Sequence, residues 1–138
     1  MNRARAVGDI RSLEAAVGAR QQASLSYDLT KSPVVTLGQF QFPRGWENTN
    51  GSRRGDVLFN LHETYPRTQP DVYISAGMRF RGEVPHTMYH TVEAGGRRWT
   101  KYCIHHVRWN PSRHNLVKML DILEISLESP HSNNPLHD

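Results

Sequence analysis

The chain has 138 residues, 37% of them hydrophobic and 22% charged, which suits one domain that buries a core without disulfides or metal. No apolar run is long enough to span a bilayer, and no signal-peptide pattern follows the basic N-terminus, so we expect a cytoplasmic protein outside the membrane. The net charge of +4 favours acidic partners without identifying them. We predict a single domain over residues 1–138, with residues 131–138 as a surface tail.

The N-terminal segment, residues 5–23, has the spacing of a helix with one apolar face. Its apolar residues recur at steps of three and four and are Val7, Ile10, Leu13 and Val17. Pro33 ends the segment, because proline and the residue before it resist the α region.

Strand patterns follow. Residues 34–42 are rich in β-branched and aromatic side chains, and their apolar phase shifts around Gly38, where we expect a bulge. Trp46 begins a short strand, and two further strands are marked by alternating apolar residues. These residues are Val57, Phe59 and Leu61 in one strand, and Val72 and Ile74 in the last.

A long stretch with weak periodicity, residues 77–96, is predicted to be a loop, and long loops in compact domains are often functional. Ser112 is the expected N-cap of a final helix, and Pro130 stops that helix. Its apolar positions are Leu116, Leu120, Leu123 and Leu127. Helix, antiparallel strands, loop and helix together predict an α+β fold.

One cysteine, Cys103, stands before this helix and has no second cysteine with which to form a disulfide. Six residues later comes Trp109-Asn110-Pro111, and the helix leads into a Pro-rich exit over residues 127–136 that closes with Pro135-Leu136. Upstream, Tyr65-Pro66 is followed by Pro70.

This ordered set resembles the active-site half of ubiquitin-conjugating enzymes. The resemblance implies a UBC-like fold: an N-terminal helix, a four-stranded antiparallel meander, a long active-site loop and a C-terminal helix packed on the sheet. It also implies an acyltransferase in which Cys103 receives a ubiquitin-like modifier from an activating enzyme as a thioester and passes it to a protein acceptor. No cofactor is expected. A basic first helix, with Arg3, Arg5, Arg11 and Arg20, would suit docking on an acidic domain of the activating enzyme.

The sequence departs from the family at the His-Pro-Asn tripeptide that usually precedes the cysteine, which is absent here. The group that stabilises the oxyanion is therefore unassigned. Histidines stand instead at His90 and at His105-His106, an arrangement similar to bacterial relatives encoded near activating enzymes and modifiers. We expect His106 or His105 to be the polar partner of the thiol, with His90 as the third candidate.

Other interpretations remain open. Cys103 has the less favoured alternative of a small buried hydrophobe, and the missing tripeptide suits an inactive UBC-fold scaffold that binds a ubiquitin-like protein or another partner. The histidines lack the paired short spacings of a zinc site, so no metal is predicted. Arginines and aromatics around Trp99 suggest single-stranded nucleic acid, but no nucleic-acid motif accompanies them, and this interpretation is the least favoured.

Overall fold

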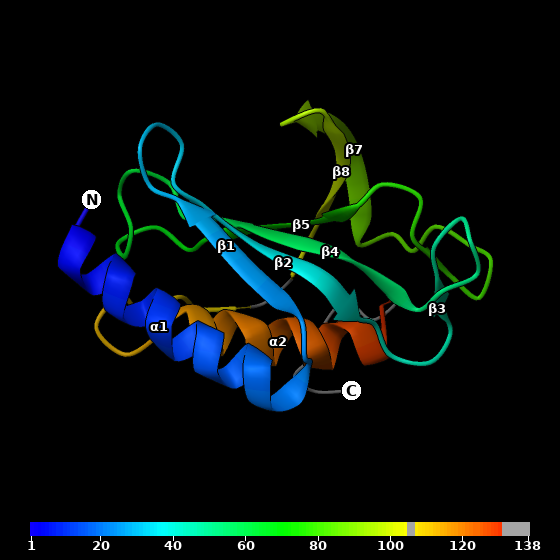
Figure 1. Ribbon diagram of the computed structural model, residues 1–138, viewed down its shortest axis with the longest axis horizontal. Helices are drawn as coiled ribbons and strands as arrows, with labels where there is room; N and C mark the ends of the chain where they lie inside the picture. The colour runs from blue at the N-terminus through cyan, green and yellow to red at the C-terminus, as the bar shows by residue number, and fades with distance from the viewer. Residues whose placement is uncertain (105–106, 131–138) are drawn as a thin grey trace.

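Two helices lie side by side beneath an antiparallel sheet in the computed structural model, which describes residues 1–104 and 107–130 (Figure 1). The helices are α1 (Arg3–Arg20) and α2 (Leu116–Glu128). The predicted α+β class, N-terminal helix and C-terminal helix are thus confirmed. The predicted surface tail, residues 131–138, lies outside the described residues.

The main sheet has six strands in the order β1-β2-β4-β5-β8-β7, and each neighbouring pair is antiparallel. The strands are β1 (Ser24–Asp28), β2 (Val34–Gln41), β4 (Arg54–Asn60), β5 (Asp71–Ser75), β7 (Met88–Ala94) and β8 (Arg97–Tyr102). A small second sheet pairs β3 (Trp46–Glu47) with β6 (Arg79–Phe80). The expected four-stranded meander is therefore wrong in strand number.

The two edge strands that the sequence failed to indicate carry mostly polar or exposed residues, whereas β8, which was also missed, buries Trp99, Thr100 and Tyr102. β1 is an edge strand in which Leu25 is the one residue that is not exposed, so it lacks an alternating apolar pattern. β7 is the opposite edge and is exposed after Met88. The stretch predicted as a loop, residues 77–96, thus contains β6 and β7, and it ends in the tight turn at Gly95 and Gly96 that leads into β8.

The bulge expected at Gly38 is confirmed, because the register between β2 and β4 shifts between Leu37 and Phe40. Gln39, inside the bulge, has a φ of 60°, and its backbone N–H donates to the Asp56 carboxylate at 3.0 Å. The shift keeps Leu37 and Phe40 both buried although three positions separate them. β2 can therefore present apolar side chains to the helices on both sides of the bulge.

Side-chain hydrogen bonds to backbone N–H groups mark the residues at which both helices begin. The Asn2 side chain caps α1 by accepting from the N–H of Arg5. α2 is capped by Asn115, which accepts from the N–H of Lys118 at 3.0 Å. The expected N-cap, Ser112, is wrong, because its N–H and hydroxyl both donate to the Asn110 side chain and it belongs to the preceding turn.

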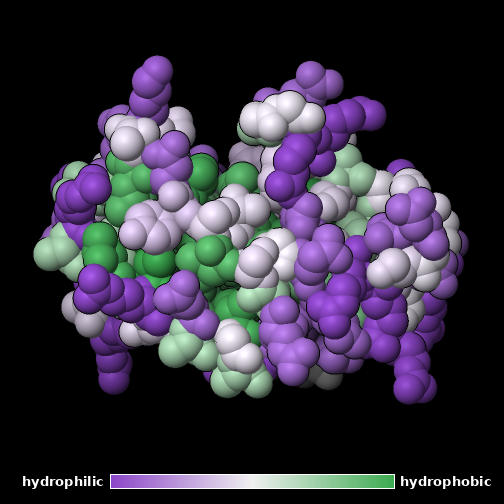
Figure 2. Space-filling view, viewed as in Figure 1, coloured by the Kyte–Doolittle hydropathy of each residue, from purple (hydrophilic) through white to green (hydrophobic). Residues whose placement is uncertain are grey.

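The core lies between the helices and the sheet. Ile10, Leu13 and Val17 of α1 are buried as predicted, and so are all four predicted leucines of α2. Hydrophobic surface seen in Figure 2 lies over α1 and β1, whose partly buried Ala16 and Leu25 pack against this core. Within the described residues, neither helix is long and apolar enough to cross a bilayer.

Candidate functional site

Cys103 is the first residue after β8, and its backbone is held in place. Its N–H donates to the carbonyl oxygen of Thr87 at 2.7 Å, directly before the point where Met88 pairs with Tyr102. Its neighbour Tyr102 is buried, whereas Cys103 itself is half-buried. The thiol is therefore carried by the end of a sheet strand, which is a rigid support for a reacting atom.

A shallow hollow of about 90 Å³ surrounds Cys103, and we name it the cysteine hollow. Its lining consists of Gln69, Pro70, Asp71, Val72, Tyr89, Lys101, Tyr102, Cys103 and Ile104. These residues come from the turn before β5 and the start of β5, from the edge strand β7, and from the end of β8 with the two residues after it. Lys101 lies in β8 and Cys103 follows the strand directly, and because they are two residues apart they belong to the same side of the chain.

Lys101 is the charged group with the best-defined surroundings in the cysteine hollow. Its Nζ lies 3.7 Å from the carboxylate of Asp71 and 5.7 Å from the ring centre of Tyr89. Burial lowers the pKa of Lys101, but the negative charge of Asp71 and the interaction with Tyr89 more than offset it, and the pKa is raised. The ammonium group is therefore charged at neutral pH.

Asp71 also contacts a histidine that the sequence analysis did not single out. The Nε2 atom of His62 lies 2.9 Å from the second carboxylate oxygen of Asp71. Asp71 thus bridges His62 and Lys101, and it holds the lysine at the edge of the cysteine hollow. No local motif predicts this trio, since its members come from three separate segments of the chain.

The predicted histidines are placed as follows. His105 and His106 lie outside the described residues. His90 sits at the β7 bulge with a φ of 53°, and its ring packs edge-on against Tyr89 at 5.0 Å between ring centres. It lines a different hollow from Cys103, so the structure does not bring these two residues into one hollow. The catalytic role of the histidines remains a prediction.

That second hollow has a volume of about 580 Å³, and we name it the arginine hollow. It is lined by Thr49, Ser75, Ala76, Gly77, Arg79, Val84, Met88, Tyr89, His90, Thr91, Arg98 and Thr100. Tyr89 lines both hollows, so the two are neighbours across the edge strand β7.

Trp109 connects two of the motifs that the sequence analysis grouped. Its indole Nε1 donates to the carbonyl oxygen of Pro66 at 2.6 Å, and its ring lies 6.4 Å from that of Tyr65. On its other side, the ring of His114 lies 5.6 Å away. The Tyr65-Pro66 turn and the Trp109-Asn110-Pro111 turn therefore form one structural unit ahead of α2.

Arg5 fastens this unit to α1. Its guanidinium donates to the carbonyl oxygens of Pro111 at 2.9 Å and His114 at 2.6 Å, and its Nε donates to Asp9 at 2.7 Å. The Tyr65 hydroxyl donates to the same carboxylate at 2.5 Å. Burial first, and then the bond to Asp9, raises the pKa of Tyr65.

The basic residues of α1 are thus not one solvated face. Arg5 is engaged as described, and Arg20 forms ion pairs with Asp121 at 2.6 Å and Glu124 at 2.9 Å of α2. Arg3 and Arg11 are exposed. Any acidic partner of α1 would therefore meet Arg3 and Arg11 rather than all four arginines.

The exit of α2 is tied back to the strand that supports Cys103. The Thr87 hydroxyl donates to the carbonyl oxygen of Pro130 at 3.1 Å, and Tyr102 and Ser126 share a buried hydrogen bond of 2.9 Å. The carbonyl oxygen of Leu127 accepts from the indole of Trp46 at 2.8 Å. The end of α2 and Pro130 therefore pack beside Thr87 and Tyr102, next to the cysteine.

The aromatic residues that suggested nucleic-acid binding are mostly buried in the fold. Trp99 is 3% exposed, and the guanidinium of Arg97 covers its ring at 4.7 Å while also pairing with Asp56. Tyr102 is buried against α2. Across residues 1–104 and 107–130, no three His, Cys, Asp or Glu side chains gather closely enough to hold a metal ion.

Comparison of the chain with protein-family models, with curated proteins and with solved structures gives no match.

Proposed function

We propose that this chain is a ubiquitin-conjugating-like acyltransferase whose nucleophile is the thiol of Cys103. The sulfur attacks the activated C-terminal carbonyl carbon of a ubiquitin-like modifier, and the bond to the activating enzyme breaks as the new thioester forms. An acceptor amine then attacks the same carbon, the carbon–sulfur bond breaks, and the amine proton passes to solvent. The partners are an activating enzyme, the modifier and a protein acceptor.

The observation that carries the proposal is the placement of Cys103. It is half-buried in an open hollow, at the end of a central strand, with its backbone fixed by Thr87. A carrier thiol needs this combination of access and rigidity rather than a full catalytic triad. Two elements of the resemblance lie near this strand end: Trp109 donates to Pro66, in the turn before β5, and Pro130 accepts from the hydroxyl of Thr87, the residue whose carbonyl holds the N–H of Cys103.

Lys101 is the group best placed to serve the chemistry. Positive charge near a reacting thioester stabilises the negative charge that develops on the acyl oxygen. Lys101 lines the hollow with Cys103 and is held by Asp71. We assign it an electrostatic role, in place of the asparagine that the family's tripeptide would supply.

A second candidate function is an inactive scaffold that binds a modifier or another partner. One observation favours it: the N–H of Cys103 donates to Thr87 and so does not point at an oxyanion. The two functions require the same fold, but only the acyltransferase requires a reactive thiol at Cys103.

The test is a charging assay with a candidate activating enzyme, modifier and ATP. The expected result is an adduct that thiol reductant removes, that Cys103→Ala abolishes, and that Cys103→Ser converts into a reductant-resistant ester. An activating enzyme that charges itself but leaves the chain unmodified would overturn the carrier proposal. Retained modifier binding in that case would support the scaffold.

A further inference from the structure

The arginine hollow has the composition of a site for an anionic ligand. Within the described residues its lining contains two arginines, a histidine and several hydroxyl groups, but no carboxylate. Elsewhere on the fold, Arg5, Arg20 and Arg97 each pair with an acidic side chain. Among residues 1–104 and 107–130, Arg79 and Arg98 form no direct ion pair with Asp or Glu, although Glu47 and Glu93 are their register partners on the neighbouring strands.

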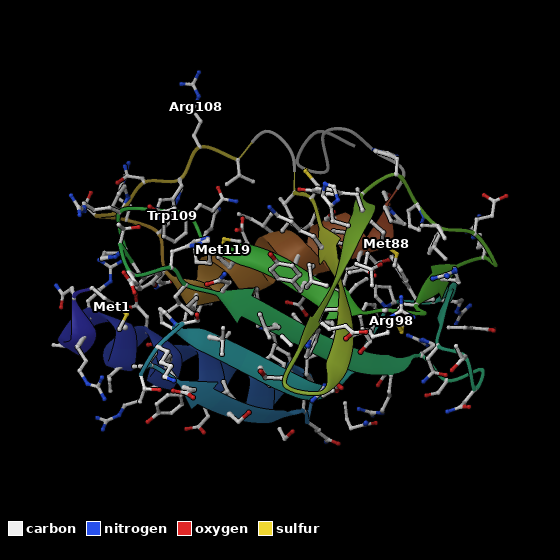
Figure 3. All side chains as sticks on the ribbon, turned by 90° about the horizontal axis from the view of Figure 1, so that it is seen from above. Met1, Met88, Arg98, Arg108, Trp109 and Met119 are labelled. Atoms are coloured by element: carbon white, nitrogen blue, oxygen red, sulfur yellow. The ribbon has the colours of Figure 1, made fainter. Side chains whose placement is uncertain are left out.

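The two guanidinium groups come from different elements and face one space. Arg79 belongs to β6, where one of its nitrogens donates to the carbonyl oxygen of Met78 at 2.7 Å and so anchors the side chain. Arg98 belongs to β8 and is exposed. Figure 3 shows Arg98 and Met88 on one flank of the hairpin, with Arg108 and Trp109 on the far side of the molecule.

The lining of the arginine hollow also includes apolar side chains. Val84 is 54% exposed there, and Tyr89 is 36% exposed on the neighbouring strand. A volume of about 580 Å³ exceeds the need of one inorganic anion and lies within the range of pockets for small organic ligands and short peptide segments.

We propose that the arginine hollow binds a short acidic segment of a protein partner, with Arg79 and Arg98 contacting its carboxylates and Val84 and Tyr89 contacting its aliphatic carbons. Charge complementarity argues for an acidic occupant, because guanidinium groups without carboxylate partners pair readily with carboxylates. Nucleic acid fits less well: stacking sites use exposed aromatic rings along a groove, and Tyr89 is the one aromatic side chain in this lining.

Under the proposed function, this occupant is part of the acceptor. Tyr89 borders both hollows, and Thr100 and Arg98 precede Cys103 on the chain by three and five residues. At about 3.3 Å per residue, Arg98 lies roughly 16 Å along β8 from the cysteine, and the odd separation places the two side chains on opposite faces of the strand, so a bound segment would cross the edge strand β7 to reach the thiol. The acceptor amine would then stand a few residues away from the acidic positions in an extended segment.

The binding half of the proposal can be tested without any thioester. A fluorescein-labelled peptide of alternating Glu and Gly is titrated with the whole chain, in which Cys103 is replaced by Ser, and anisotropy is recorded at low salt. We expect saturable binding that weakens by about tenfold or more in Arg98→Glu and in Arg79→Gln. The matched control is Arg113→Glu, an exposed arginine just before α2, which should bind as the parent does.

Several outcomes would overturn the proposal. These are equal binding of a Gln/Gly peptide, equal loss in Arg113→Glu, and preferential binding of single-stranded DNA that Arg98→Glu abolishes. The second variant, Arg79→Gln, keeps the test decisive if Arg98→Glu unfolds, which thermal denaturation would reveal. Peptide binding with no charging of Cys103 would refute the proposed acyl transfer and leave the acidic site standing.

Discussion

The indole Nε1 of Trp109 donates a hydrogen bond of 2.6 Å to the carbonyl oxygen of Pro66, 43 residues earlier in the chain. The contact joins the turn that leads into β5 to the turn that leads into α2. Since Cys103 lies between these turns in sequence and beside β5 in space, the contact closes the loop that carries it. Trp109 therefore fixes the chain that follows Cys103 to the turn before β5.

Replacing Trp109 with Phe should lower the free energy of unfolding by about 1 kcal/mol, because the bond to Pro66 is lost while most ring contacts remain. Urea denaturation at neutral pH measures the change. For comparison, Trp46→Phe should cost about 2–3 kcal/mol, since it leaves the buried carbonyl of Leu127 without its donor. Equal losses in the two variants would contradict this ranking.

Arg5→Lys should destabilise the fold by about 1–2 kcal/mol, because an ammonium group cannot contact Asp9 and the two carbonyls of the α2 entry together. Arg3→Lys is the matched control two residues earlier on the same helix. Arg3 is exposed, so its replacement should change stability by less than about 0.5 kcal/mol. A similar effect of both replacements would show that Arg5 acts only through its charge.

His114 should make the fold less stable as pH falls. Burial first, and then the charges of Lys118 and Arg113, lower its pKa. Its Nδ1 also accepts a bond of 3.0 Å from the N–H of Asn110, which only the neutral ring can do. Because the folded pKa lies below the unfolded one, the stability is present above the unfolded value, about 6.5, and declines as pH falls through the folded value.

The measurement is an NMR titration of the His114 ring, paired with denaturation curves across the same pH range. Lys118→Gln should move the titration of His114 toward higher pH, because one of the repelling charges is removed. A titration that does not respond to this replacement would refute the electrostatic part of the explanation.

The β7–β8 turn should depend on its glycines. Ala94 pairs with Arg97, so Gly95 and Gly96 form a two-residue turn, with φ values of 59° and 75°. Gly96→Ala should cost about 1 kcal/mol in a denaturation experiment, because side chains rarely adopt this conformation. Gly95→Asn should be nearly neutral, since asparagine tolerates it; a large loss there would argue against this turn geometry.

Lys101→Gln should slow thioester formation on Cys103 in the charging assay by about two- to fivefold, because a positive charge that would stabilise the developing oxyanion is removed from the cysteine hollow. Lys101→Arg should retain most of the rate. An exposed lysine elsewhere, in Lys31→Gln, serves as the control for net charge. If Lys101→Arg is as slow as Lys101→Gln, the lysine acts through its shape and not its charge.

The sequence predicted the parts of the fold that rest on apolar spacing. Both helices, the β2 bulge and the strand containing Phe59 follow from it, because buried faces require regular positions. The edge strands β1 and β7 could not be predicted in this way, since their exposed residues carry no regular apolar spacing. Gly95-Gly96 between β-forming residues was the one available signal for the hairpin.

The candidate site, like the fold, could be predicted from the sequence only in part. Cys103 could be selected from sequence because it is the one cysteine and is followed by a patterned helix. The contacts that Asp71 makes with His62 and Lys101 depend on strand order, which no local pattern reveals. The chain segments that form the arginine hollow are likewise brought together only by the pairing of β5 with β8.

The position of α2 at the end of the described chain has a consequence for synthesis. All six strands of the main sheet are complete at Tyr102, yet the leucines that cover the sheet beside α1 begin at Leu116. During synthesis, the strands up to Tyr102 leave the ribosome before α2. In that interval the apolar side chains that α2 covers on one face of the sheet are exposed to solvent. Chaperone dependence should be greatest in that interval, before the last helix emerges.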